Sequence, residues 1–187
     1  MDRRLKVLSA AGAAIALAVI FASAALAART FGDGTHRVGK DIAAGTYRAP
    51  KVSGGLGGCY WARLRNFSGG LNSIIANDNA SGPAVVTIKG SDRGFESNDC
   101  GTWTSNLARV SKSRTRIAAG TWIVGIDVAP GTYLSRAGSS CYWARLRAFT
   151  GDLNSIIAND NPRGRAIVTI SRSDKGFDTN GCGTWTR

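Results

Sequence analysis

The heptapeptide Cys-Tyr-Trp-Ala-Arg-Leu-Arg stands at residues 59–65 and again at residues 141–147. Two more segments recur at the same spacing. The nonapeptide at residues 71–79 and the pentapeptide Cys-Gly-Thr-Trp-Thr at residues 100–104 both return 82 positions later. Recurrence of such segments at one fixed spacing over a domain length indicates one folding unit present twice. Each copy therefore tests the other, because a residue that carries essential chemistry in both units must occur in both.

The repeat predicts two modules, at residues 34–104 and 120–187. A short segment at residues 28–33 precedes the first module. Residues 105–119 lie between the modules and hold four Lys or Arg residues and no acid, a composition that predicts a solvated basic linker.

The secondary-structure signal is β. Short β-branched runs such as residues 85–88 and their counterparts 167–170 alternate with Gly-containing turn signals. Residues 71–76 fit either a helix or a strand, and their adjacent Ile residues favour a strand. We expect an all-β protein in which each module forms five to seven short antiparallel strands in a small sandwich or barrel.

The four cysteines fall two to a module and allow three pairings. A module of about 70 residues has little core to stabilise it. The repeat favours the pairing that makes each module self-sufficient, namely Cys59 with Cys100 and Cys141 with Cys182. The closely spaced Cys or His pairs of a structural zinc site do not occur in the sequence. We expect no metal and no cofactor.

Residues 1–27 have the pattern of a secretory signal peptide: basic residues, an apolar run at residues 8–26, and Ala-Leu-Ala at its end. Cleavage there starts the mature chain at Ala28. The alternative is an uncleaved signal anchor, because the apolar run nears spanning length. No second apolar run of that length follows. We therefore expect a secreted, extracellular protein without a membrane span after cleavage, in a compartment that permits disulfides.

The mature chain is basic. The first 27 residues hold 3 of the 24 Lys and Arg and 1 of the 12 Asp and Glu, which leaves 21 against 11 and a net charge of +10. Such an excess favours an anionic neighbour such as a cell-wall polymer, a lipid surface or nucleic acid, and it also serves solubility alone. No specific nucleic-acid partner is indicated.

Several motifs carry a family resemblance. The pattern Val-Gly-x-Asp-[Ile/Val]-Ala-x-Gly-Thr-Tyr is followed by Cys-Tyr-Trp-Ala-Arg-Leu, Ile-Ile-Ala-Asn, Ser-Asp-x-Gly-Phe and Cys-Gly-Thr-Trp. This order resembles exported proteins of high-GC Gram-positive bacteria that carry the unit singly or in tandem. The resemblance covers nearly the whole mature chain. It implies an extracytoplasmic location, and it implies no established enzyme activity and no ligand.

The comparison of the two copies does not support a catalytic or metal-binding motif. The single histidine, His36, aligns with Trp122, so a Ser-His-Asp or Cys-His mechanism would exist in one module at most. Residues 77–79, Asn-Asp-Asn, lack the further carboxylates of a calcium site, and an Asx turn is their expected role. We assign no catalytic residue.

Paired carboxylates give an alternative hypothesis, a small secreted hydrolase. Asp92 and Glu96 are four residues apart across a turn, and Asp174 and Asp178 repeat them. Two carboxylates at suitable separation are what glycoside hydrolysis requires. The competing role of Asp92, in Ser-Asp-Arg-Gly, is to close the turn through its own backbone.

The strand that begins at Cys59 is the candidate binding site. The two copies agree at 18 of 21 positions over residues 59–79, against 9 of 14 over 34–47 and 13 of 20 over 85–104. A regular strand places Trp61, Arg63 and Arg65 on one face, where they either pack over the disulfide as core or bind a sugar or an anion. The candidate residues are Trp61, Arg63, Arg65, Trp143, Arg145 and Arg147.

The leading hypothesis is a secreted, non-enzymatic protein whose duplicated β modules bind an envelope or extracellular ligand, an anionic polymer or a glycan. A third hypothesis is an inhibitor or toxin-like module. It would present the loops at residues 48–58 and 134–140, which differ between the copies in length and sequence.

Overall fold

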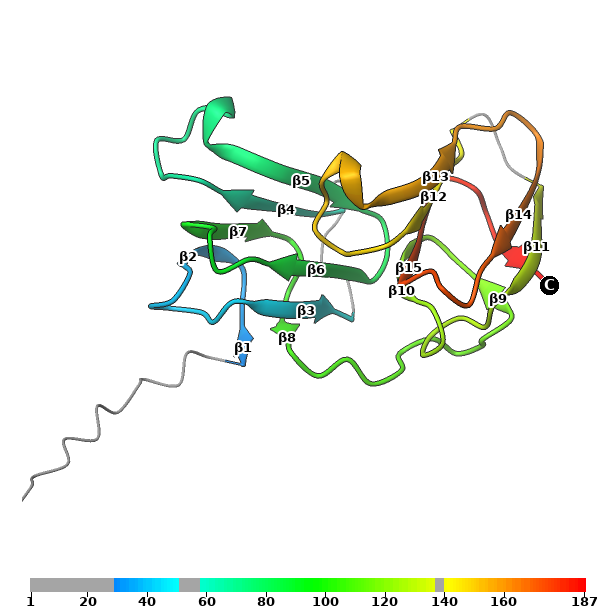
Figure 1. Cartoon of the computed structure of the whole chain (residues 1–187), viewed down its shortest axis with the longest axis horizontal. Helices are drawn as coiled ribbons and strands as arrows, with labels where there is room; N and C mark the ends of the chain where they lie inside the picture. The colour runs from blue at the N-terminus through cyan, green and yellow to red at the C-terminus, as the bar shows by residue number, and fades with distance from the viewer. Residues whose placement is uncertain (1–28, 51–57, 137–139) are drawn as a thin grey trace, which may run out of the picture.

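The computed structural model describes residues 29–50, 58–136 and 140–187. The expected signal peptide, residues 1–27, lies outside the described residues, as do residues 51–57 and 137–139 of the two variable loops. The described chain forms two β-sandwiches that lie side by side (Figure 1). Among these residues, no helix is long and apolar enough to cross a membrane.

The first module is a sandwich of two four-stranded antiparallel sheets. One sheet has the strand order β1-β8-β3-β6 and the other has the order β2-β7-β4-β5. The strands are β1 (Thr30–Phe31), β2 (Gly34–Arg37), β3 (Gly45–Ala49), β4 (Cys59–Leu64), β5 (Ile74–Ala80), β6 (Ala84–Ile88), β7 (Gly94–Asn98) and β8 (Trp103–Thr104).

The second module repeats this topology, with strand orders β9-β16-β11-β14 and β10-β15-β12-β13. Its strands are β9 (Arg116–Ile117), β10 (Gly120–Ile123), β11 (Gly131–Arg136), β12 (Tyr142–Leu146), β13 (Ile156–Asp160), β14 (Arg165–Ile170), β15 (Gly176–Asn180) and β16 (Trp185–Thr186). The expected pair of all-β sandwiches is confirmed. The described residues of each module form eight strands instead of five to seven, because two-residue strands such as β1 and β8 carry no periodic signal.

The ambiguous segment that starts at residue 71 is both helix and strand. It begins as a single 3₁₀ turn, Leu71–Ser73, and continues as β5. The second module has the same turn at Leu153–Ser155, before β13. A 3₁₀ turn of three residues is too short to show a helical period. The apolar pattern therefore indicated only the strand that follows it.

Each core contains a tryptophan, a phenylalanine and a disulfide. Trp103 is fully buried and meets Phe95 edge to face, with ring centroids 5.2 Å apart. The indole of Trp103 donates a hydrogen bond to Ser97, which satisfies its polar nitrogen. The second core repeats this arrangement with Trp185, Phe177 and Thr179. The predicted disulfides, Cys59–Cys100 and Cys141–Cys182, are both present.

Each module begins earlier than the repeat alone indicated, and residues 105–119 make specific contacts with both modules. β1 and β9 precede residues 34 and 120, and each pairs with the last strand of its own module. The carbonyl of Ala108 accepts a hydrogen bond from buried Arg48, and the amide of Val110 donates to buried Asp127. The residues of this segment are largely exposed, but its backbone also satisfies a buried ion pair and its end joins a sheet.

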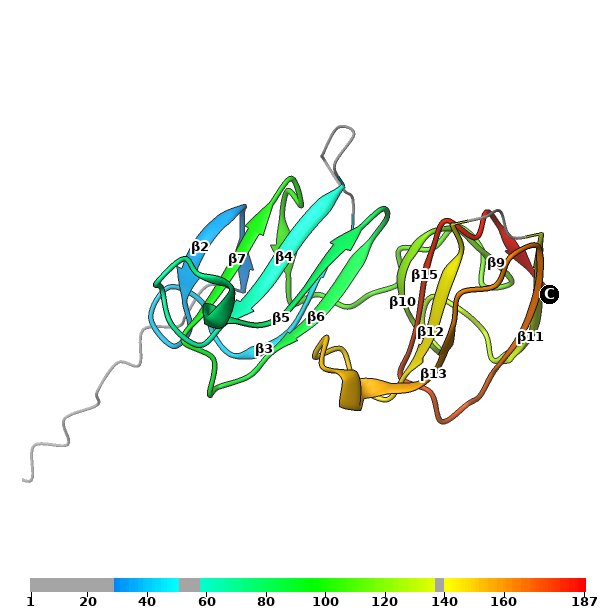
Figure 2. The same ribbon diagram turned by 90° about the horizontal axis from the view of Figure 1, so that it is seen from above.

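The two modules contact each other through unlike surfaces (Figures 1 and 2). The first module offers β5 and β6, the edge strands of its two sheets. The second module offers the outer face of β10, β15 and β12 and the loop at residues 147–155 that joins β12 to β13. Backbone bonds join the two sides: Thr121 N donates to Pro83 O at 2.7 Å, and Thr87 N donates to Phe149 O at 2.7 Å. The open edge of one sandwich is thus covered by the other.

Removal of the first disulfide by the double substitution Cys59→Ala and Cys100→Ala should lower the free energy of unfolding by about 4 kcal/mol, because the bridge closes a loop across 41 positions. Urea unfolding followed by tryptophan fluorescence measures the loss. The Cys141→Ala and Cys182→Ala variant is the matched comparison, since its bridge has the same separation. A variant as stable as the parent protein contradicts the prediction.

Candidate functional site

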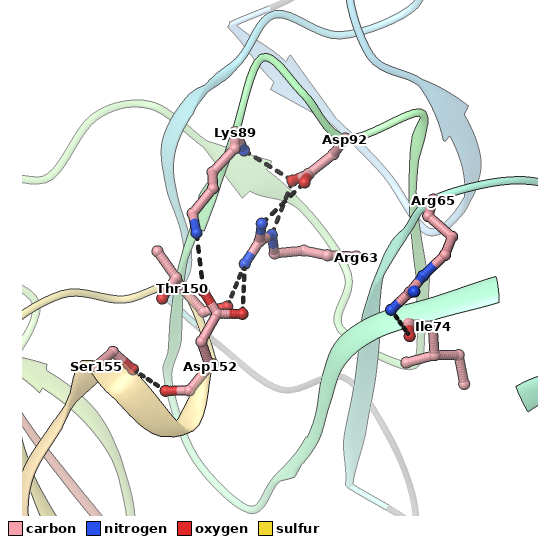
Figure 3. Close-up of polar contacts among 8 residues, drawn as sticks. All are labelled: Arg63, Arg65, Ile74, Lys89, Asp92, Thr150, Asp152 and Ser155. Carbon is pink, nitrogen blue, oxygen red and sulfur yellow. Dashed lines mark hydrogen bonds and ion pairs between the residues drawn. The ribbon is translucent and has the colours of Figure 1, made fainter. Parts of the chain in front are cut away.

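Arg63 of the repeated heptapeptide is buried, with 1 % of its side chain exposed. Its Nε and Nη2 each donate to a carboxylate oxygen of Asp92 at 2.8 Å, so the two side chains form a bidentate pair (Figure 3). Asp92 also accepts a hydrogen bond from the amide of Lys89 and so closes the turn between β6 and β7. The turn role expected for Asp92 is present, and the carboxylate serves the arginine as well.

The remaining nitrogen of Arg63 reaches into the second module. Nη1 donates to the carbonyl of Thr150 at 2.5 Å and lies 3.4 Å from the carboxylate of Asp152 (Figure 3). Lys89 approaches the other oxygen of Asp152 at 2.8 Å. Because a buried guanidinium needs acceptors for all its donors, Arg63 ties the loop of the second module to the edge of the first.

The same loop of the second module packs against Trp61. Its side chain is 4 % exposed, and a Cβ placed on Gly151 would come within 2.7 Å of the indole ring. Gly151 also has a φ of +70°, which favours glycine. Gly69, at the equivalent position of the first module, has a φ of +76° and no described atom within 4 Å of such a Cβ. The loop of the first module is therefore free.

The second module holds the same pair in an open setting. Arg145 binds Asp174 through two hydrogen bonds of 2.7 and 2.9 Å, yet 23 % of its side chain is exposed. The part of the chain that the structure describes supplies no acceptor for Nη1 of Arg145. Trp143 is only partly buried. One heptapeptide thus forms a closed contact in one module and an open edge in the other.

Arg65 lies apart from the buried site of Trp61 and Arg63. Strand β4 ends at Leu64, and the bulge beside it belongs to β5, because Arg63 pairs with Ala76 and Leu64 with Ile74. Arg65 follows the strand, is exposed, and donates only to the carbonyl of Ile74 at 3.2 Å (Figure 3). Arg147 is likewise exposed. The expected site therefore divides into buried docking residues and exposed arginines.

A second exposed cation lies beside each of these arginines. The amide of Arg93 donates to the carbonyl of Leu64 at 2.8 Å, which brings residue 93 next to Arg65. Lys175 makes the same 2.8 Å bond to Leu146, next to Arg147. We call Arg65 with Arg93, and Arg147 with Lys175, the two basic clusters. Our sequence interpretation missed Arg93 and Lys175, although a cation kept as Arg or Lys in both copies was the available signal.

The carboxylates of the hydrolase hypothesis lie on opposite faces of one sheet. Glu96 pairs with Ala62, and Phe95 pairs with Arg63. Directly paired residues share a face and successive residues alternate. Asp92 lies on the side of Arg63, which faces the core with Phe95, whereas Glu96 lies on the outer face. The two carboxylates do not share a cleft.

His36 and its replacement have the same local role. The His36 ring lies 2.9 Å from the carbonyl of Gly32, four residues earlier. Trp122 donates to the carbonyl of Ala118, also four residues earlier, at 2.9 Å. Both rings bond this carbonyl, which explains how they substitute for each other. Among the described residues, no group of three or more His, Cys, Asp or Glu side chains is placed to bind a metal ion.

A cavity between the modules brings together carboxylates that are far apart in the sequence. Asp78 of β5 and Asp178 of β15 both line it, beside Tyr142. Asp178 accepts a hydrogen bond from the hydroxyl of Thr121 at 2.9 Å. Burial, reinforced by the charge of Asp78, raises the pKa of Asp178 to about 7. Burial also raises the pKa of Asp78.

Two copies of one family model cover the chain, at residues 28–104 and 114–186. The model describes the Rv1352-like extracellular domain. The chain belongs to this family. It is an extracellular protein built of two Rv1352-like domains, and the matched ranges include β1 and β9 within their domains. No curated protein and no solved structure gives a significant match.

The two Rv1352-like domains should respond differently to loss of the same arginine. Arg63→Ala leaves the Asp92 carboxylate buried and unpaired and frees the loop of the second domain, so we expect a loss of about 3–5 kcal/mol in the free energy of unfolding. Arg145→Ala, the matched variant, should cost at least about 1 kcal/mol less, because solvent already reaches Arg145 and no loop of the other domain depends on it. Urea unfolding compares the two, and equal losses would contradict the assigned asymmetry.

The contact between the domains should weaken as the pH rises. The raised pKa of Asp178 means that the docked state holds a proton that the separated state releases, so stability falls as the pH rises from about 4 to about 7. Asp178→Asn should remove this dependence and stabilise the protein at pH 8 by about 1 kcal/mol or more. Thermal unfolding across this range measures the effect. Glu96→Gln, the same change at the equivalent position outside the cavity, is the control.

Proposed function

We propose that this protein is a non-enzymatic extracellular binding protein that holds an anionic envelope polymer or an acidic glycan at its two basic clusters. The observation that carries the proposal is the repeated placement of two exposed cations by one backbone bond, Arg93 to Leu64 and Lys175 to Leu146. Anions are the ligands that closely placed, solvent-accessible cations attract.

The charges of both clusters are available to a ligand. All four side chains are exposed, and within the described residues none of them forms an ion pair. The other arginines of the repeated heptapeptide differ in this respect, because Arg63 and Arg145 are each committed to a carboxylate. The candidate ligand residues therefore narrow from the whole heptapeptide to its last arginine and the neighbouring cation.

Duplication suits a polymeric ligand. A polymer with repeated anionic groups engages both clusters at once, and two linked sites bind more tightly than either alone. The envelope of a high-GC Gram-positive bacterium, the source that the motif resemblance implies, would supply such a polymer outside the cell. A binding role is also supported by the opposite placement of Asp92 and Glu96, which leaves the hydrolase hypothesis without its paired carboxylates.

The test is binding of the exported chain to long-chain polyphosphate and to polygalacturonate, with neutral dextran as the reference polymer. Each cation near an anionic surface contributes about 1 kcal/mol. The variant that carries Arg65→Ala, Arg93→Ala, Arg147→Ala and Lys175→Ala should therefore lose at least about tenfold in affinity for both anionic polymers.

The control removes the same number of charges elsewhere, from the exposed residues Arg29, Arg109, Arg116 and Arg136. If net charge alone governs binding, the control and the cluster variant lose equally, and the site assignment is wrong. If the unaltered chain binds neither anionic polymer, the proposed function is wrong.

A further inference from the structure

The contact between the two domains joins unlike surfaces, so it leaves one copy of each surface unused. The second domain keeps a free edge, formed by β13 and β14. The first domain keeps a free outer face, formed by β2, β7 and β4, together with the loop at residues 65–73. We propose that the free edge of one chain docks on the free face and loop of a second copy, so that the internal contact is repeated between chains. This assembly goes beyond the proposed polymer binding and does not depend on it.

The free edge exposes residues whose equivalents on the covered edge, at β6, are buried. Val85 of β6 is 3 % exposed beneath the second domain, whereas Ile167 at the same position of β14 is 62 % exposed. Thr87 of β6 donates its amide to the second domain, and Thr169 is its equivalent on β14. Since β14 is an edge strand, alternate amides along it point away from the sheet.

The free face and loop of the first domain retain the surface that performs the internal docking. Phe67, equivalent to Phe149, is 52 % exposed. Phe149 accepts the Thr87 bond through its carbonyl, and Thr121, equivalent to Thr35, donates through its amide to Pro83. Both bonds use backbone atoms only, so they can form again whatever the side chains are.

One polar contact that cannot be repeated has lost both of its members together. Lys89 and Asp152 form an ion pair across the internal contact, and their equivalents are Ser171 and Gly70. A contact between chains therefore loses this ion pair without stranding a charge on either side. In the buried pair of Arg48 and Asp127, only the arginine is replaced.

The equivalents of that second pair are Leu134 and Asp41. Asp41 has a partner in its own domain, because Arg37 binds it at 2.9 Å. The repeated contact would therefore be weaker than the internal one, which has these two ion pairs and the linking segment, but it would bury no unpaired charge at these positions.

New charges complement each other across the proposed contact. Internally, Ser81 donates to Asn180 at 2.7 Å, and the equivalent pair between chains is Arg163 and Asn98. Asp99 follows Asn98 directly, and Glu96 lies on the same outer face. A cation on the edge thus lies near acids on the face, and Asp160 of the edge, the equivalent of Asp78, also lies near Glu96 there, as Asp78 does near Asp178.

Residue 165 adds a second cation to the free edge, since Arg165 stands where the first domain has Pro83. Arg163 and Arg165 are both exposed. The edge that docks internally has no cation at these two positions, and the face that receives it has Asp178 in place of Glu96. The charge difference therefore favours the contact between chains specifically.

Repetition of a head-to-tail contact gives an open chain or a closed ring, because the two surfaces are different. Arg147 stays exposed although its loop is docked, so Arg65 on the equivalent loop would also stay exposed. The assembly would align the basic clusters in a row.

Sedimentation velocity of the exported chain over a range of concentrations, at low salt and without polymer, tests the proposal. The average mass should rise above that of the monomer with concentration. The double substitution Arg163→Glu and Arg165→Glu should weaken the association by at least about tenfold, because like charges then face each other. Glu96→Arg should weaken it as well.

The triple variant that combines these changes should recover association, because it restores opposite charges across the contact. Recovery excludes misfolding as the reason for either loss. The matched control is Arg29→Glu with Arg116→Glu, which changes the charge equally at exposed positions on the opposite edges of the sheets and should leave association unchanged.

A chain that is monomeric at every concentration overturns the proposal, and so does association that the edge and face variants do not alter. These outcomes are separate from the failure of the proposed function. A monomeric chain that binds polyphosphate through its basic clusters leaves that function intact, whereas a chain that assembles without binding the polymers removes it and leaves the assembly.

Discussion

The guanidinium of Arg63 is the interaction on which the arrangement of the two domains depends. It lies almost out of solvent, so each of its donors needs an acceptor. Asp92 supplies two acceptors from within the domain, and the carbonyl of Thr150 supplies another from the neighbouring domain. The first domain is therefore complete only when the second is docked. The ion pair of Arg48 and Asp127 adds a second buried link and fixes the connecting segment.

The duplication produces two domains of one topology in two environments. An exposed sheet edge invites pairing with another chain, and proteins commonly cover it. Here the edge at β6 is covered by the second domain, while the edge at β14 is not covered by any described residue. The substitutions between the copies follow this difference, because Lys89 and Asp152 appear together at the covered contact and are replaced together by Ser171 and Gly70 elsewhere.

Much of each domain was predictable because its determinants are local or repeated. The pairing of Cys59 with Cys100 followed from the presence of two cysteines in each copy, and the β-branched runs located β6 and β14. The candidate site was predicted less well. Strand β4 ends at Leu64, so Arg65 lies beyond it and is exposed while Arg63 is buried, and the ends of strands are poorly marked in a sequence. The raised pKa of Asp178 comes from its burial and then from the charge of Asp78 in the other domain, and no spacing within one repeat reveals either.

The sequence by itself determined the repeated unit, its all-β character, the disulfide pairing and the basic charge, since each depends on composition or on spacing within a single copy. Only the tertiary structure decided that identical heptapeptides have different roles. Arg63 and Arg145 have the same neighbours along the chain, yet one is buried under a loop and the other is open to solvent. The physical reason is that burial depends on what packs against a residue, and the packing partner here comes from the other domain.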